Sequence, residues 1–117
     1  MDPLKRELTN PDMARLLKAV ERLRILDREV PGQVVSCFLY IASHNPCHKE
    51  ALEEDLGFTT ASASRNIDWL TNKHRLKKPG MGIVIKQRDP VNGRRLIIKL
   101  SPKGEELIAN LTSDLYD

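Results

Sequence analysis

The chain has 117 residues, 40% of them hydrophobic and 4% aromatic, which fits one compact domain over residues 1–117 and excludes a multidomain enzyme. Its net charge of +3 is unevenly spread, because residues 57–104 carry eleven basic and two acidic side chains and the remainder carries eight basic and 14 acidic ones. Such a basic block is typical of a surface that binds nucleic acid or another anion. The longest apolar stretch, residues 34–42, is too short to cross a bilayer, and the N-terminus lacks the layout of a signal peptide. We therefore predict a cytoplasmic protein with no membrane partner.

Candidate reactive residues are few. Cys37 and Cys47 do not make the disulfide framework of a small secreted domain, so buried reduced thiols are expected, with a redox role left open. His44, Cys47 and His48 lack a fourth metal ligand at a useful spacing. The sequence contains no glycine-rich phosphate loop, Ser-His-Asp constellation or paired buried carboxylates. We predict a protein that is not an enzyme and has no catalytic residues, no bound metal and no cofactor.

Hydrophobic spacing predicts two helices in the N-terminal part of the chain. Asn10 is a good N-cap and Pro11 a good first helical residue. Apolar residues then recur at three- and four-residue steps, which predicts an amphipathic helix over residues 10–30. Residues 33–43 have apolar side chains on more than one face, so we expect a central helix that its neighbours bury.

Residues 48–73 have the pattern of two short helices joined by a turn. Gly57 is a natural residue after the end of the first helix, which covers residues 48–56. Thr59 or Thr60 can cap a second helix over residues 61–73. On this second helix the residues expected to pack inward are Ala63, Ile67 and Leu70. Those expected on the outer side are Ser62, Arg65, Asn66, Trp69 and Lys73.

The rest of the sequence predicts a loop, a hairpin and a last helix. Residues 74–82 read as an exposed basic loop, and the period of the pattern then becomes two, with Asn92-Gly93 as the tip of a hairpin over residues 82–100. Ser101-Pro102 opens a helix over residues 103–115. The hairpin residues expected to face the core are Ile83, Ile85, Leu96, Ile98 and Leu100.

This order of elements predicts a mostly α fold with a small β-hairpin, a winged helix-turn-helix. Residues 34–111 resemble the DNA-binding core of MarR-type transcriptional regulators. The matching fragments are Lys49-Glu50-Ala51-Leu52, the stretch from Thr59 to Arg65, the stretch from Asp89-Pro90 to Arg94-Arg95, and the stretch from Leu100 to Glu105. The resemblance implies a sequence-specific regulator that binds double-stranded DNA, with a recognition helix in the major groove and a basic wing in the minor groove.

The sequence departs from this family in three places. Asn92 stands where a second wing aspartate is usual, which weakens any aspartate brace on the wing arginine. The loop over residues 74–82 is longer than usual. Family members normally continue through long C-terminal helices that dimerise, whereas this chain stops at Asp117. We therefore expect a homodimer through the N-terminal and C-terminal helices.

The candidate site residues lie on the recognition helix and the wing. Ser62, Arg65 and Asn66 are donors near the helix N-terminus, where base edges are read, and arginine suits guanine while asparagine suits adenine. The resemblance adds Ser64, and it implies that Arg94 enters the minor groove. Arg88 and Arg95 are expected to meet phosphates. The predicted DNA-binding residues are Ser62, Ser64, Arg65, Asn66, Lys73, Arg88, Arg94 and Arg95.

A second function is compatible with the same sequence. Winged helices also act as protein-protein interaction modules, and a fold does not fix a function. Trp69, the extended basic loop and the missing dimerisation helices favour a protein partner in a transcription or replication complex. Trp69 can either cover the loop or pack against a partner.

Overall fold

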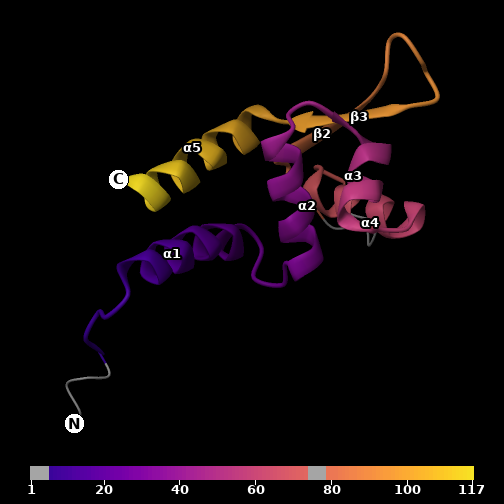
Figure 1. Ribbon diagram of the computed structural model, residues 1–117. Helices are drawn as coiled ribbons and strands as arrows, with labels where there is room; N and C mark the ends of the chain where they lie inside the picture. The colour runs from indigo at the N-terminus through magenta and orange to yellow at the C-terminus, as the bar shows by residue number, and fades with distance from the viewer. Residues whose placement is uncertain (1–5, 74–78) are drawn as a thin grey trace.

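The computed structural model describes residues 6–73 and 79–117 (Figure 1). In this part of the chain five helices accompany a three-stranded antiparallel sheet, which confirms the predicted fold class. The elements are α1 (Pro11–Leu26), α2 (Gly32–Ser43), β1 (Cys47–His48), α3 (Lys49–Leu56), α4 (Thr60–Leu70), β2 (Val84–Arg88), β3 (Leu96–Leu100) and α5 (Pro102–Tyr116). Among the described residues no helix is long and apolar enough to span a membrane.

Helix α1 begins as predicted and ends earlier. The Asn10 side chain accepts the backbone N–H of Met13 at 3.2 Å, and Pro11 is the first helical residue. The helix ends at Leu26 rather than at residue 30, because Asp27 is extended (φ −154°) and its carboxylate accepts the backbone N–H of Glu29. An aspartate that bonds its own backbone two residues on favours a turn over a helix.

Helix α2 lies at the centre of the core, as its apolar faces predict. Its buried side chains are Val34, Cys37, Phe38 and Ile41, and they meet the inward face of α4 and strand β3. Burial raises the pKa of the Cys37 thiol to about 12 and also raises that of Cys47. The described residues contain no group of three or more histidine, cysteine or acidic side chains placed to hold a metal ion.

The buried thiols give a first testable expectation. Because a thiol reacts as its thiolate, Cys37 and Cys47 should both resist iodoacetamide at pH 8 in the folded protein and react fully in urea. Intact-mass spectrometry after a timed alkylation measures this directly. Alkylation of one cysteine per chain in the folded state, with an unchanged circular dichroism spectrum, would contradict this prediction and would favour a redox role for the labelled cysteine.

The sheet has the order β1-β3-β2, and its first strand was not predicted. In this strand, β1, Cys47 pairs with Ile98 and His48 pairs with Ile97. A strand of two residues is too short to show an alternating sequence pattern. Between β2 and β3 the register pairs Val84 with Leu100 and Lys86 with Ile98. Cross-strand partners share one face of a sheet, so Lys86 points to the core side.

The prediction that Ile85 faces the core is wrong, since its side chain is 38% exposed. Ile83 and Val84 are both buried instead. Ile83 precedes the strand, just after Gly82 turns the chain with φ +71°, and its backbone N–H bonds the Leu70 carbonyl at the end of α4. The alternation therefore restarts at Val84, which shifts every later residue of β2 to the opposite face.

Helices α1 and α5 lie side by side within one chain and extend away from the rest of the fold (Figure 1). Leu23 on α1 and Leu107 and Leu111 on α5 are buried. Arg22 forms a bidentate pair with Asp114, and Lys18 Nζ lies 3.6 Å from the same carboxylate. The opposite side of α1 stays open and forms an apolar face of Met13, Leu16, Leu17 and Val20, hereafter the α1 apolar face.

The pair between α1 and α5 predicts a pH dependence of stability. The Arg22 guanidinium, together with Lys18, lowers the pKa of Asp114 below its ordinary value. A carboxyl whose pKa is lowered by folding stabilises the protein when the pH is above its pKa in the unfolded chain, which is about 4. This stabilisation is lost as the pH falls through the lowered pKa of the folded state. Urea unfolding should therefore show the wild type more stable than Asp114→Asn at pH 5–7, with the difference shrinking below about pH 4. A difference that is constant from pH 7 to pH 2 would refute this assignment.

Candidate nucleic-acid interface

The turn between α3 and α4 is fixed by local chemistry. Gly57 takes the left-handed conformation (φ +69°) that ends α3, as predicted. Thr59 caps α4 by accepting the backbone N–H of Ser62 at 3.1 Å. The Lys49 ammonium is buried and donates to Glu53 Oε1 at 3.0 Å and to the Thr60 carbonyl at 3.2 Å. This contact holds the start of α4 against α3.

Helix α4 divides into an inner and an outer face. Ala63, Ile67 and Leu70 are buried, which confirms the predicted inner face. Arg65 is exposed, and Ser62 and Ser64 are partly exposed. Within residues 6–73 and 79–117, no hydrogen bond or ion pair engages the Arg65 guanidinium. Its five donors therefore remain available for a ligand.

The expectation that Asn66 lies on the outer face is wrong. Its exposed fraction is 8%, and its Nδ2 donates to Gln33 Oε1 on α2 at 3.5 Å. Asn66 falls three residues after Ala63 and next to Ile67, so it belongs to the edge of the buried stripe. Trp69, also expected outside, packs partly buried against the core. Both side chains position α4 instead of presenting donors outward.

The expectation that Lys73 lies on the recognition helix is also wrong, because α4 ends at Leu70. The Thr71 hydroxyl donates to the Asp68 carbonyl at 2.9 Å and accepts the backbone N–H of Lys73 at 3.3 Å. Such bonds compete with continuation of a helix. Lys73 is exposed and forms an isolated β-bridge with Pro79. Arg75, Lys77 and Lys78 of the predicted basic loop lie outside the described residues.

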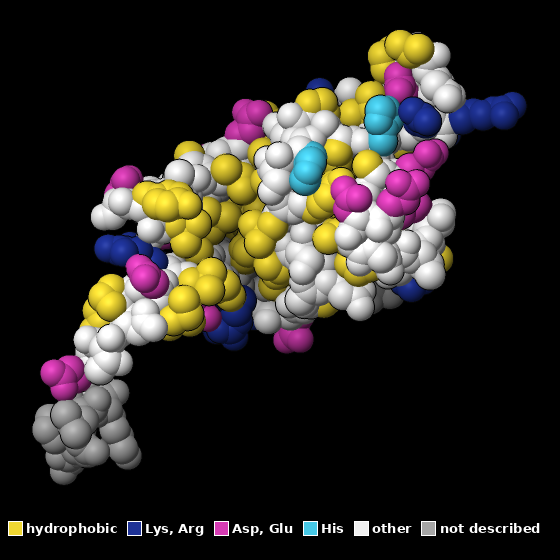
Figure 2. Space-filling model, viewed as in Figure 1, with side chains coloured by type: hydrophobic (Ala, Val, Ile, Leu, Met, Phe, Trp, Pro, Cys, Tyr) yellow, Lys and Arg dark blue, Asp and Glu magenta, His cyan; other side chains and the backbone are white. Residues whose placement is uncertain are grey.

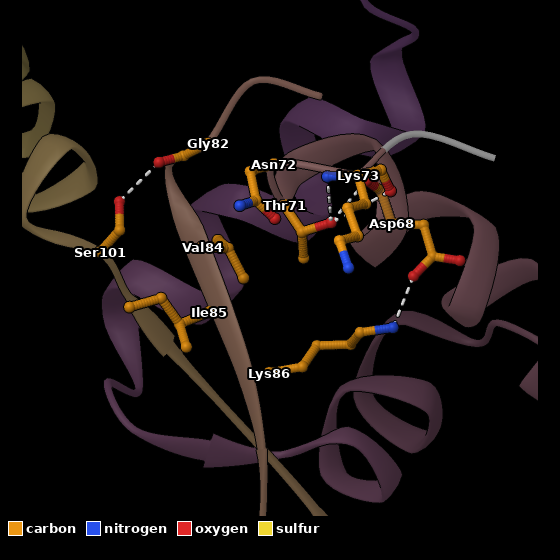
Figure 3. Close-up of a pocket in the computed structure, with 9 residues that line it drawn as sticks. All are labelled: Asp68, Thr71, Asn72, Lys73, Gly82, Val84, Ile85, Lys86 and Ser101. Carbon is orange, nitrogen blue, oxygen red and sulfur yellow. Dashed lines mark hydrogen bonds and ion pairs between the residues drawn. The ribbon is translucent and has the colours of Figure 1, made fainter. Parts of the chain in front are cut away.

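An open groove of about 560 Å³ lies between the end of α4 and strand β2 (Figure 3). Lys86 Nζ lies 2.7 Å from Asp68 Oδ1, and this contact joins strand β2 to helix α4. Figure 3 shows Lys73 directed into the same space. Lys86 is not among the residues that the sequence predicts to bind DNA. The predicted alternation in β2 is shifted by one residue and puts Lys86 on the wrong face of the sheet. An alternation that starts at Val84 places Lys86 on the face that is turned toward α4.

The wing, residues 84–100, is braced at its tip by polar contacts. Asp89 Oδ1 accepts the backbone N–H of Val91 at 2.8 Å, and His48 Nε2–H donates to Asp89 Oδ2 at 3.0 Å. The contact with His48, followed by that with Val91, lowers the pKa of Asp89. Arg88 Nη1 donates to the Gly93 carbonyl at 2.8 Å. No sequence signal marks His48 and Asp89 as partners, because 41 residues separate them.

The predicted hairpin tip is present, and its basic side chains point outward. The backbone N–H of Arg95 donates to the Asn92 carbonyl at 2.9 Å, and the Asn92 side chain accepts the backbone N–H of Arg94 at 3.2 Å. Asn92 thus shapes the turn in place of an ionic brace. Arg88, Arg94 and Arg95 are all exposed, and in the described part of the chain the guanidinium groups of Arg94 and Arg95 have no hydrogen-bond or ion-pair partner.

The comparisons with known proteins agree with this geometry. Neither a protein-family model nor a curated protein sequence matches the chain. Among solved structures, MarR is similar at 21% identity, with a TM-score of 0.60 over 97% of this chain and 75% of that one. The chain has the MarR-type winged-helix fold. A MarR-like transcriptional regulator from Thermotoga maritima gives 22% identity and a TM-score of 0.61 over 97% of this chain and 75% of its own.

The MarR-type fold also occurs in a DNA complex among these structures. Reduced AbfR bound to DNA is 16% identical, with a TM-score of 0.62 over 88% of this chain and 71% of that one. The predicted resemblance to MarR-type regulators is thus confirmed at the level of the fold. In this fold α4 is the second helix of the helix-turn-helix and carries Arg65, while β2, β3 and the turn between them form the wing, whose turn carries Arg94 and Arg95.

Proposed function

We propose that the protein is a cytoplasmic transcriptional regulator that binds double-stranded DNA in a sequence-specific manner. It acts by occupying its DNA site and is not an enzyme. The observation that carries this proposal is the exposed guanidinium of Arg65 on the recognition helix, together with those of Arg94 and Arg95 on the wing. The MarR-type fold and the basic block over residues 57–104 support it. Duplex DNA is a dense line of phosphates, which such a block attracts.

The proposed contacts follow from the position of each side chain. Helix α4 enters the major groove, where Arg65 reads guanine and the hydroxyl of Ser62 reaches a base edge. Arg94 enters the minor groove from the wing tip. The remaining proposed contacts are to phosphates, through Ser64, Lys73, Arg88 and Arg95. Asn66 is left out of the proposed interface because it is buried.

A second copy of the chain is proposed to cover the α1 apolar face. Figure 2 shows hydrophobic side chains gathered over α1 and α5, whereas basic side chains project at the tip of the wing. An exposed apolar patch of this kind marks an interaction site. A two-fold homodimer through α1 and α5 places two recognition helices on half-sites about one helical turn apart.

The test is DNA binding measured by fluorescence anisotropy on duplexes that the protein selects from a random pool. We expect an enriched sequence with two-fold symmetry, an affinity that falls steeply with salt, and a dimer by light scattering. Failure to enrich any sequence, with equal affinity for all duplexes, would overturn the proposal. In that case a pull-down that returns one protein partner would favour the alternative of an interaction module.

A further inference from the structure

One hydrogen bond joins the recognition helix to the end of α1. The indole N–H of Trp69, one residue before the end of α4, donates to Asp27 Oδ2 at 2.6 Å. Asp27 is the C-cap residue that follows the last residue of α1, and its backbone N–H donates to the Leu23 carbonyl at 3.1 Å. Its other carboxylate oxygen accepts the backbone N–H of Glu29 at 2.9 Å. A single carboxylate thus holds the connection from α1 to α2 with one oxygen and the recognition helix with the other.

The geometry of this contact is stiff on both sides. Hydrogen bonds to an ionised carboxylate are shorter and stronger than those between neutral groups. Trp69 packs against the core, and its backbone carbonyl accepts the N–H of the buried residue Met81 at 3.1 Å. A large indole with two side-chain torsions has little freedom to follow Asp27 alone. A displacement of Asp27 must therefore move the end of α4 or break the bond.

Helix α1 connects this contact to the α1 apolar face. Leu17 and Val20 lie on the open side of the helix, and Leu23, one turn further on, is buried against the rest of the protein. The same helix ends at Leu26, and Asp27 follows it as the C-cap residue. A second copy of the chain that covers the α1 apolar face therefore acts on a helix whose C-cap residue, Asp27, is hydrogen-bonded to α4.

We propose that Asp27 and Trp69 couple occupancy of the α1 apolar face to the orientation of α4, so that Asp27 is a positioning residue for DNA binding. The DNA part of this inference rests on the proposed function. Coupling between two sites is reciprocal, so DNA binding also tightens association at the α1 apolar face. The coupling itself has a readout that needs no DNA, because Trp69 is the only tryptophan of the chain and its emission reports on this contact.

The first test is Asp27→Asn, which removes the charge and leaves one acceptor oxygen where the carboxylate offers one to Glu29 and the other to the indole. The Trp69 emission maximum should shift, and DNA affinity should fall by about fivefold or more. This direction is opposite to the simple electrostatic effect, because losing an acidic charge favours binding to phosphates. Circular dichroism and thermal unfolding establish that the variant is folded. An unchanged emission spectrum with equal or tighter DNA binding overturns the proposal.

Asp12→Asn is the matched control, because it makes the same charge change near the other end of α1. The Asp12 carboxylate contacts Arg15 at 3.4 Å on the exposed surface. We expect the emission of Trp69 to stay unchanged and DNA affinity to stay equal or to rise slightly. A loss of affinity equal to that of Asp27→Asn would show that charge on α1, and not the contact with Trp69, controls binding.

The second test is a double-mutant cycle with Leu17→Ser, which alters the α1 apolar face at a residue that is 61% exposed. Leu17→Ser should change the emission of Trp69 in the wild-type background and leave it unchanged in the Asp27→Asn background. Additive changes overturn the coupling. If neither the wild type nor any variant binds a duplex selectively, the proposed function fails. The coupling between the α1 apolar face and α4 still holds in that case if the changes in Trp69 emission are non-additive. The two failures are therefore distinguishable.

Discussion

Gly104→Ala is expected to destabilise the protein by about 3 kcal/mol or more, because a side chain at this position meets backbone that cannot move aside. A Cβ on Gly104 would lie 2.1 Å from the Ile83 carbonyl oxygen. That carbonyl is already bonded to the backbone N–H of Ser101, at 3.1 Å. Relief of the clash has to move the start of α5 away from the sheet, along with the α1 helix that packs on α5. Urea unfolding followed by circular dichroism measures the loss of stability.

Gly93→Ala is the matched control for this prediction. A Cβ at Gly93 meets nothing within 4 Å, and its φ is not positive. The same chemical change should therefore alter the free energy of unfolding by less than about 1 kcal/mol, with a small gain possible from a less flexible unfolded chain. Equal losses in the two variants would mean that α5 does not approach Ile83 as closely as the structure places it.

Local chemistry explains the elements that the sequence predicts correctly. Asn10, Thr59 and Ser101 each accept a backbone N–H at the start of a helix, and Gly57 supplies a left-handed end. These signals act within three or four residues, so a single sequence contains them in full. The recognition helix, the wing and the exposed Arg65 all follow from such short-range rules.

The errors have a common physical origin in contacts between residues far apart in the chain. Asn66 is polar at the edge of a helical stripe, and only the presence of Gln33 across the interface decides that it is buried. His48 and Asp89, and likewise Asp27 and Trp69, meet across more than 40 residues. Gly104 belongs to a fragment shared with the MarR-type pattern, yet its steric reason appears only when Ile83 is placed beside it. Fold therefore follows from the sequence more completely than the site does.

Arg65→Ala is expected to weaken binding to the selected DNA site by roughly 10- to 100-fold, since one bidentate contact to guanine contributes about 1–3 kcal/mol of discrimination. Arg65 is the exposed cation of the recognition helix, and within the described residues its guanidinium has no intramolecular bond to lose. The substitution should therefore leave stability almost unchanged. Arg15→Ala is the control, because it removes the same charge from the exposed surface of α1 and should change affinity little.

Arg65→Lys separates sequence reading from simple attraction to phosphates. Lysine keeps the charge but loses the planar fork that fits guanine, so affinity for the selected site should fall while affinity for unrelated duplexes and the salt dependence stay close to wild type. Arg95→Ala should behave in the opposite way. It should weaken binding to all duplexes by the same factor and lower the slope of log affinity against log salt by about one. If Arg65→Lys binds the selected site as the wild type does, Arg65 contacts phosphate only, and the specificity must come from the wing or from DNA shape.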